Sequence, residues 1–236
     1  PRLADPIWPW AVAALWFSGP LMLRHTMNAL ETGLYILFIM LALLYFLHIL
    51  RRGDEAGTAT LWGFGILCGL VFLARNDGAF LIITIFLSWA LYELTISRRS
   101  VTATALRLFP PGLISLIVAS PWMIHNKLEF GSIVPISGSA QQIGSDFGQN
   151  LALLPVTLFE HSFPMLPIPS SMEGSTAVIA ICLIALLVVC TLYLTEALRM
   201  EPALRFMLLA YALFVLMLGA YYGLNFGAPH FVSRYL

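Results

Sequence analysis

The residues best suited to chemistry in this chain are cations, histidines and carboxylates that gather at junctions between long apolar stretches. One junction reads RHTMNALET from Arg24 to Thr32, a second is Arg75-Asn76-Asp77, and a third runs from His125 to Glu129. Arginine, lysine and histidine bind phosphate, whereas carboxylates can act as a base, orient a substrate or hold a divalent metal ion. These junctions therefore suggest a site for a phosphate-bearing substrate.

Each junction also has a plain structural explanation. Thr26 or Asn28 can cap a helix, with Glu31 near its positive end. Asn-Asp-Gly at 76–78 is a common turn sequence, and Lys127 can extend its amine to the bilayer surface. An adjacent Arg and Asp near a membrane are costly unless they are paired or used. The sequence leaves the structural and the functional alternatives open.

Several functional classes lack support. The chain has no glycine-rich phosphate loop, no histidine pair at zinc spacing and no nucleophile elbow. Twelve basic and twelve acidic residues give a net charge of zero, so no overall field attracts nucleic acid. The cysteines Cys68, Cys182 and Cys190 all lie inside apolar runs, which indicates packing rather than a disulfide framework.

The composition indicates a membrane protein. Hydrophobic residues make up 60% of the chain and charged residues 10%, whereas soluble domains carry roughly 25% charged residues. A helix needs about 20 apolar residues to cross a bilayer. The pattern predicts an all-α transmembrane bundle of about seven spans: Ile7 to Leu23, Gly33 to Leu50, Ala59 to Ala74, Gly78 to Ile96, Leu108 to Ile124, Thr176 to Leu194 and Ala203 to Tyr222.

The basic residues predict one orientation of these spans. Alternation places eight of the twelve Lys and Arg on one side, namely Arg2, Arg51, Arg52, Arg98, Arg99, Arg107, Arg199 and Arg205. By the positive-inside rule this side is cytoplasmic, and its arginines are expected to be simple orientation anchors. The three polar junctions then lie outside the cell, together with His161 and His230. His48, near the cytoplasmic end of its span, is expected to be packed or interfacial.

The segment from His125 to Ser175 predicts a long extracytoplasmic loop within a single transmembrane domain covering residues 1–236. Connections between elements usually have about 4–6 residues, and this one has about fifty. Leu151 to Phe159 is apolar but too short to span, and prolines follow it, which favours an interfacial or re-entrant helix. Because the chain begins at Pro1 and ends in Tyr235-Leu236, it is expected to be a piece of a longer polytopic protein.

Four stretches resemble a known family. Met27 to Tyr35 (MNALETGLY) is similar to the N-G-M-E-T-G-L-Y stretch of bacterial integral-membrane glycosyltransferases of the GT-C type, and Leu73 to Ala79 (LARNDGA) is similar to their L-A-R-P-D-G turn. Pro121 to Pro135 resembles their P-W-x-x-x-N-x-x-x-F-G-S-x-x-P segment, and Ser233 to Leu236 would begin their R-Y-L element. The four stretches occur in the family's order across nearly the whole chain.

The resemblance implies a multi-pass enzyme of the bacterial inner (plasma) membrane, with the lipid bilayer around it. Such an enzyme transfers a sugar from a polyprenyl-phosphate donor to a glycan, lipid or protein acceptor on the extracytoplasmic face, with no nucleic-acid partner. The family's main catalytic carboxylate usually lies in the first outer loop, which is expected upstream of Pro1. Within this chain, Glu31 and Asp77 are the candidate catalytic residues. The candidate phosphate-binding residues are Arg24, His25, Arg75, His125, Lys127 and Arg234. A divalent metal ion is a candidate cofactor, with Glu31, Asp77 and Glu129 as its ligands.

A membrane transporter or lipid flippase is the alternative function. A transporter predicts ionisable residues near the bilayer midplane and broken helices there. In this chain the most secure apolar stretches are nearly free of charge and the polar residues lie at their ends, which favours a surface enzyme.

Overall fold

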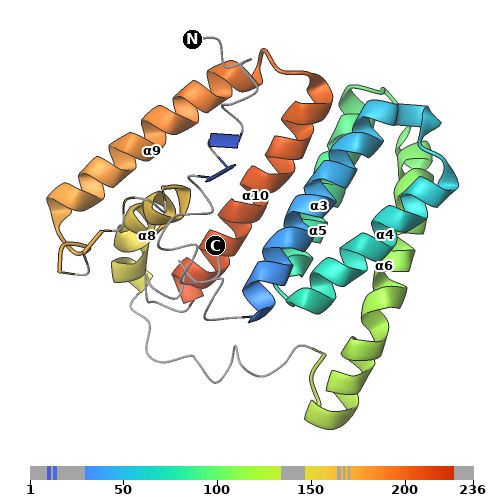
Figure 1. Ribbon diagram of the computed structural model, residues 1–236, viewed down its shortest axis with the longest axis horizontal. Helices are drawn as coiled ribbons and strands as arrows, with labels where there is room; N and C mark the ends of the chain where they lie inside the picture. Colours follow the sequence, from blue (N-terminus) through green and yellow to red (C-terminus); the bar gives the residue numbers. More distant parts are fainter. Residues whose placement is uncertain are drawn as a thin grey trace. The chain divides into compact units, whose positions relative to one another are not determined.

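A computed structural model describes residues 10–11, 13–14, 30–133, 147–163, 166, 168–169 and 171–225 of the chain. Every regular element in these ranges is a helix (Figure 1). The chain divides into two compact units. Unit 1 comprises Pro1–Gly33, Gly144–Tyr193 and Gly219–Leu236, and unit 2 comprises Leu34–Ile143 and Leu194–Leu218.

The helices lie on the apolar stretches of the sequence. Their bounds are α3 Leu30–Arg52, the short 3-10 helix η1 Gly53–Glu55, α4 Thr58–Ala74, α5 Gly78–Thr95, α6 Val101–Phe130, α8 Phe147–Ser162, α9 Thr176–Ala197 and α10 Pro202–Asn225. The first predicted span, Ile7 to Leu23, falls almost entirely outside the described residues. The other six predicted stretches each coincide with a helix.

Among the described residues, four helices are long and apolar enough to cross a membrane: α3, α5, α6 and α9. Two shorter apolar helices are α4 and the Pro202–Leu218 part of α10. These helices indicate a membrane protein in a lipid environment. The full count of seven spans stays a prediction.

Helix α6 is longer at both ends than the sequence predicted. Its N-terminus is capped by Ser100, whose side chain accepts a hydrogen bond of 3.2 Å from the Ala103 amide. At its C-terminus, Gly131 adopts the left-handed conformation with φ 70° and ends the helix. Residues 125–130 are therefore helical, and the prediction that a loop begins at His125 was wrong. Within that segment, α8 covers the predicted helix at Leu151 to Phe159.

The core of unit 2 is built on aromatic side chains from α3, α4 and α5. The rings of Phe46, Phe64 and Phe86 each lie about 6 Å from the Trp89 indole, at 6.1, 5.9 and 6.0 Å between centroids. Phe46, Phe64 and Trp89 are fully buried. Such contacts add to the stabilisation from burial alone, so this cluster fixes the three helices against one another.

Two glycines let α4 approach α6 closely. A Cβ atom on Gly65 would lie 2.6 Å from the Pro111 carbonyl oxygen, and one on Gly69 would lie 2.5 Å from Val118 Cβ. Both distances are shorter than any normal contact, so only glycine fits. Small residues four apart are the usual means by which membrane helices pack backbone to backbone.

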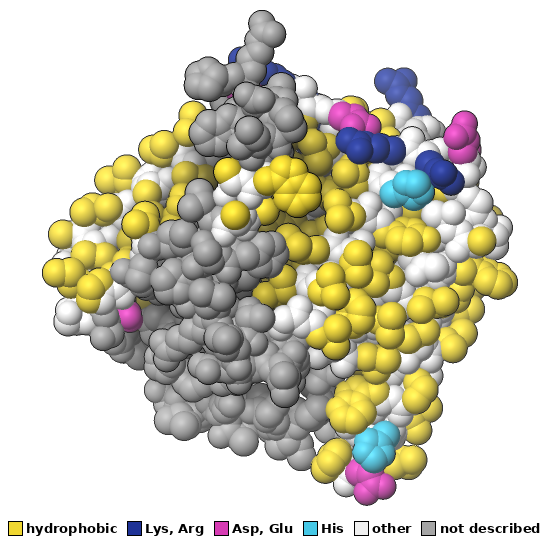
Figure 2. All heavy atoms as spheres, in the orientation of Figure 1, with side chains coloured by type: hydrophobic (Ala, Val, Ile, Leu, Met, Phe, Trp, Pro, Cys, Tyr) yellow, Lys and Arg dark blue, Asp and Glu magenta, His cyan; other side chains and the backbone are white. Residues whose placement is uncertain are grey.

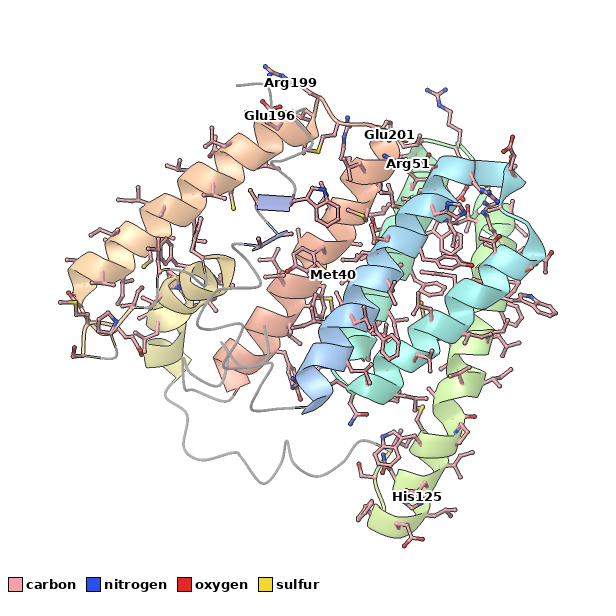
Figure 3. The ribbon with its side chains drawn as sticks, in the orientation of Figure 1. Met40, Arg51, His125, Glu196, Arg199 and Glu201 are labelled. Carbon is pink, nitrogen blue, oxygen red and sulfur yellow. The ribbon has the colours of Figure 1, made fainter. Side chains whose placement is uncertain are left out.

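Polar contacts join α10 to the neighbouring helices of unit 2. The Ser88 hydroxyl on α5 donates to the Phe206 carbonyl at 2.5 Å, and Arg51 at the end of α3 pairs with Glu201 at 2.8 Å (Figure 3). Arg205 donates hydrogen bonds of 2.9 Å to the carbonyls of Ala197 and Leu198, where α9 ends. These bonds satisfy carbonyls that the end of a helix leaves without partners.

Charged side chains lie at the two ends of unit 2, as expected for antiparallel membrane helices joined by short turns. Hydrophobic side chains cover the region between these ends on the face shown in Figure 2. We call one end the arginine-rich end; it carries Arg51, Arg52, Arg98, Arg99, Arg107, Arg199 and Arg205. The opposite end, which we call the Arg75 end, carries the α4–α5 turn and the C-terminus of α6 (Figure 1).

Unit 1 contributes α8 and most of α9. Val156 of α8 is fully buried, and the tilted rings of Phe159 and Phe163 lie 4.9 Å apart between centroids. Helix α9 is apolar on all sides, and most of its side chains are not covered by other parts of the protein. A helix of this kind suits direct contact with lipid.

Candidate site at the Arg75 end

Eight residues were predicted to be catalytic or phosphate-binding, and Glu129 was a further candidate metal ligand. The structure describes the side chains of five of these nine residues. Arg24, His25 and Arg234 lie outside the described residues, as does Asn28. Glu31 falls in the first turn of α3, where the backbone alone is described. The described side chains are those of Arg75, Asp77, His125, Lys127 and Glu129.

Arg75 and Asp77 form an ion pair at the turn between α4 and α5. Arg75 Nη2 donates to Asp77 Oδ2 at 2.9 Å. The two side chains are only 10% and 15% exposed, so this is a largely desolvated pair rather than a surface contact. Charges held out of water interact strongly and are costly to leave without a partner.

The turn that holds this pair is tightly built. The Gly78 amide donates to the Arg75 carbonyl at 2.9 Å, and the Ala79 amide to the Asn76 carbonyl at 3.0 Å. A Cβ on Gly78 would lie 2.7 Å from the Val71 carbonyl oxygen, so a larger residue would push α4 and α5 apart. The backbone itself thus places Arg75 and Asp77 at one point.

Asp77 is at the N-cap position of α5, yet its side chain makes no capping hydrogen bond there. Its carboxylate instead accepts from Arg75. The negative charge still lies near the positive end of the helix, where it is favoured. The position of the Asp77 side chain is therefore explained by its pairing with Arg75 and not by capping of α5.

Tyr35, one turn into α3, completes this site. The Arg75 guanidinium carbon lies 5.5 Å from the centroid of the Tyr35 ring, within the range of a cation–π contact. Tyr35 is 3% exposed. Its hydroxyl is buried and has no hydrogen-bond partner among the residues that the structure describes. In the sequence, Tyr35 is the last residue of the family-like stretch MNALETGLY, and no local pattern marks it as a site residue.

His125, Lys127 and Glu129 lie on the last turns of α6, also at the Arg75 end (Figure 3). The His125 ring stacks on Trp122 at 5.8 Å and meets Phe130 edge-on at 6.3 Å. Lys127 Nζ donates to the Gly131 carbonyl at 2.9 Å. This bond is the structural role that a lysine at a helix C-terminus commonly has. Glu129 is exposed.

Asn126, between these residues, points inward. It is 1% exposed, and its amide nitrogen lies 3.5 Å from the Ile133 carbonyl. Asn126 therefore holds the turn that follows α6. The convergence of His125 or Lys127 with Arg75 and Asp77 in a single cavity stays a prediction.

The predicted metal ligands do not form a recognisable metal centre in the described part of the chain. Asp77 is paired with Arg75, and Glu129 is at the exposed end of α6. No group of three or more His, Cys, Asp or Glu side chains suited to a metal ion occurs among the described residues.

The arginine-rich end holds an ion network that the sequence analysis missed. Glu93, in the last turn of α5, has a side chain only 3% exposed. Its carboxylate oxygens lie 2.6 Å from Arg99 Nε and 3.0 Å from Arg107 Nε, and one of them accepts a hydrogen bond of 3.1 Å from the Trp89 indole. The two Nε contacts have ion-pair distances without hydrogen-bond alignment.

Asp54 of η1 joins the same network. It pairs with Arg99, and with Arg107 at 3.2 Å, while Arg107 also donates to the Gly53 carbonyl. Two arginines thus face two carboxylates. Burial, and secondarily the charge of Arg107, lower the pKa of Arg99, although an arginine remains protonated at neutral pH. For Arg99 and Arg107 the prediction of simple anchors was wrong, since these two arginines hold η1 against the ends of α5 and α6.

A lone carboxylate inside an apolar stretch was the signal that could have revealed this network. Glu93 is the one acidic residue of α5, and an ionisable residue inside a membrane helix calls for a partner.

Comparisons of the chain with family models, curated proteins and solved structures found no match.

Proposed function

We propose that this chain is part of a GT-C-type membrane glycosyltransferase, which transfers a sugar from a polyprenyl-phosphate donor to an acceptor on the extracytoplasmic face. The main support is the desolvated Arg75–Asp77 pair, held by a glycine-dependent turn at one end of a bundle of apolar helices. A lipid-linked phosphate would present its head group at this depth while its tail stays in the bilayer. The resemblance of the stretches around Tyr35, Arg75 and Pro121 supports the same function.

The reaction is a direct displacement at the anomeric carbon. The acceptor hydroxyl oxygen bonds to this carbon as the bond to the phosphate oxygen breaks, and the hydroxyl proton passes to a carboxylate base. The departing polyprenyl phosphate gains one negative charge. Donors placed at that charge stabilise the transition state more than the ground state.

In this proposal Arg75 binds the phosphate, and Asp77 fixes the position of the Arg75 guanidinium. A guanidinium has five N–H donors in a planar fork, so it can bind a carboxylate and a phosphate oxygen together. Asp77 is then an orienting residue rather than the base. Glu31 or a carboxylate from a preceding segment is left as the base. His125 and Lys127, at the same end, would meet the acceptor or the outer phosphate oxygens.

The transporter alternative receives less support. The buried charge in the described spans, Glu93, lies in the last turn of α5 and faces two arginines. A charge on a transport path is expected near the bilayer midplane. The experiment described next separates the transferase function from the transporter function.

The test uses the full-length protein in proteoliposomes with a labelled polyprenyl-phosphate sugar and its acceptor. We expect Arg75→Ala to reduce turnover about 10²–10³-fold, as for loss of one donor at a developing charge. Arg52→Ala, an exposed arginine of the opposite end, should leave turnover unchanged. It is a better control than Arg99, which contacts Glu93.

Loss of activity must be separated from loss of folding. Arg75→Ala breaks the Arg75–Asp77 pair, and breaking a buried pair costs about 3–5 kcal/mol. The double variant Arg75→Ala/Asp77→Ala removes both charges and should recover much of that stability. Turnover that stays low in this double variant, once its stability is recovered, supports the proposal. Full turnover there, or lipid translocation without sugar transfer, would refute it.

A further inference from the structure

The hydroxyl of Tyr35 is the most unusual polar group of the Arg75 end. It is buried, and the described residues offer it no hydrogen-bond partner. Buried hydroxyls in folded proteins are nearly always satisfied. An exception deserves an explanation, and here it occurs beside a desolvated ion pair.

Packing alone does not explain a tyrosine at this position. The ring of Tyr35 is 3% exposed and carries the Arg75 guanidinium carbon at 5.5 Å from its centroid. A phenylalanine would fill the same space and offer the same aromatic face to the cation. The hydroxyl adds only the cost of burying a polar group without a partner, so its function lies in a contact that the described part of the protein does not supply.

The cation beside Tyr35 favours an anionic partner. The Arg75 guanidinium carbon lies 5.5 Å from the centroid of the Tyr35 ring, and Arg75 Nη2 is paired with Asp77 at 2.9 Å. A phenol O–H is a neutral donor that gives a strong hydrogen bond to an anionic oxygen. Asp77 already accepts from Arg75. A phosphate oxygen drawn to Arg75 would satisfy the Tyr35 hydroxyl as well.

We propose that Tyr35 is a substrate-contacting residue, whose hydroxyl donates a hydrogen bond to the phosphate that Arg75 binds. The inference rests on the proposed function. Arg75 supplies the charge, Asp77 orients Arg75, and Tyr35 adds a second donor from a different helix. The hydrogen bond strengthens as the phosphate gains charge during sugar departure, so it contributes to turnover more than to binding of the donor.

The test is Tyr35→Phe in the full-length protein. Because the hydroxyl has no described partner, its removal should leave the thermal midpoint unchanged or slightly raised. We expect kcat/KM for the polyprenyl-phosphate sugar to fall about 10–100-fold, the usual effect of losing one hydrogen bond to a charged group, with most of the fall in kcat. Tyr92→Phe is the matched control. Its hydroxyl lies 3.4 Å from the Leu50 carbonyl near the arginine-rich end, so this variant should keep full activity.

A binding measurement distinguishes failure of this inference from failure of the proposed function. Polyprenyl phosphate without sugar should raise the thermal midpoint of the wild-type protein more than that of Tyr35→Phe. Sugar transfer that is equal in wild type and Tyr35→Phe would overturn the role of Tyr35 and leave the glycosyltransferase intact. If the wild type transfers no sugar but binds the lipid phosphate through Tyr35, the proposed function fails and the contact stands. Equal binding by both proteins, without transfer, overturns both.

Discussion

Replacing Glu93 by alanine should destabilise the protein severely, because it removes the acceptor of a buried network. The Glu93 side chain is 3% exposed and Arg107, which it faces at 3.0 Å, is 12% exposed. Without Glu93, Arg107 would be opposed by Asp54, whose side chain is 78% exposed, and the Trp89 indole would lose its acceptor. Removing one partner of a buried pair costs about 3–5 kcal/mol.

Thermal unfolding in detergent micelles, followed by tryptophan fluorescence, measures this loss. For a chain of this length, each kcal/mol shifts the midpoint by about 2–4 °C, so Glu93→Ala should lower it by about 6–20 °C. Glu196→Ala is the control, because Glu196 pairs with Arg199 at 3.3 Å and both are well exposed. Exposed pairs contribute about 0–1 kcal/mol. A shift of the unfolding midpoint for Glu93→Ala as small as that for Glu196→Ala would show that the Glu93 network does not stabilise the protein.

Two further predictions concern packing and orientation. Gly69→Ala should destabilise the protein by about 1–3 kcal/mol through overpacking. Gly112→Ala is the control and should be neutral or stabilising, because a Cβ there would meet Phe86 at an ordinary 3.5 Å. Equal unfolding midpoints of the two variants would contradict the close approach of α4 and α6. In a background without the native cysteines, Ser171→Cys should react with an impermeant thiol reagent from outside intact cells and Glu55→Cys should not, and labelling in the reverse sense would invert the proposed orientation. Glu55 is exposed whereas the neighbouring Ala56 is buried, which makes Glu55 the informative position.

The sequence predicted the helices well because their cause is local. An apolar run long enough to cross a bilayer must form a helix, since every backbone polar group needs a partner there. The end of α6 was the exception. Pro121 and Trp122 look like the exit of a span, but the helix continues through the proline and ends at Gly131, where the backbone turns left-handed.

The site was predictable only in part, because its contacts depend on pairing across helices. The composition of the Arg75-Asn76-Asp77 junction indicated either a turn or a functional role; the structure shows the turn, with Arg75 and Asp77 paired within it, and the functional role stays a prediction. Nothing local to α3 indicates that the Tyr35 ring lies against Arg75, about forty residues further along the chain. In the same way, Glu93 acquires Arg107 from α6 and Arg99 from the segment just before α6, which the pattern of α5 alone does not specify.

The length of α6 separates the polar groups of the Arg75 end by depth. At a rise of about 1.5 Å per residue, the 18 residues of α5 extend about 27 Å and the 30 residues of α6 about 45 Å. A bilayer core is about 30 Å thick, so α5 fits within it while α6 must tilt or project beyond it. With α5 centred in such a core, Arg75 lies near the edge of the hydrocarbon region, and His125 lies further out along α6. A chain with this geometry can meet a lipid-borne molecule and a water-borne one at two heights along the same membrane normal.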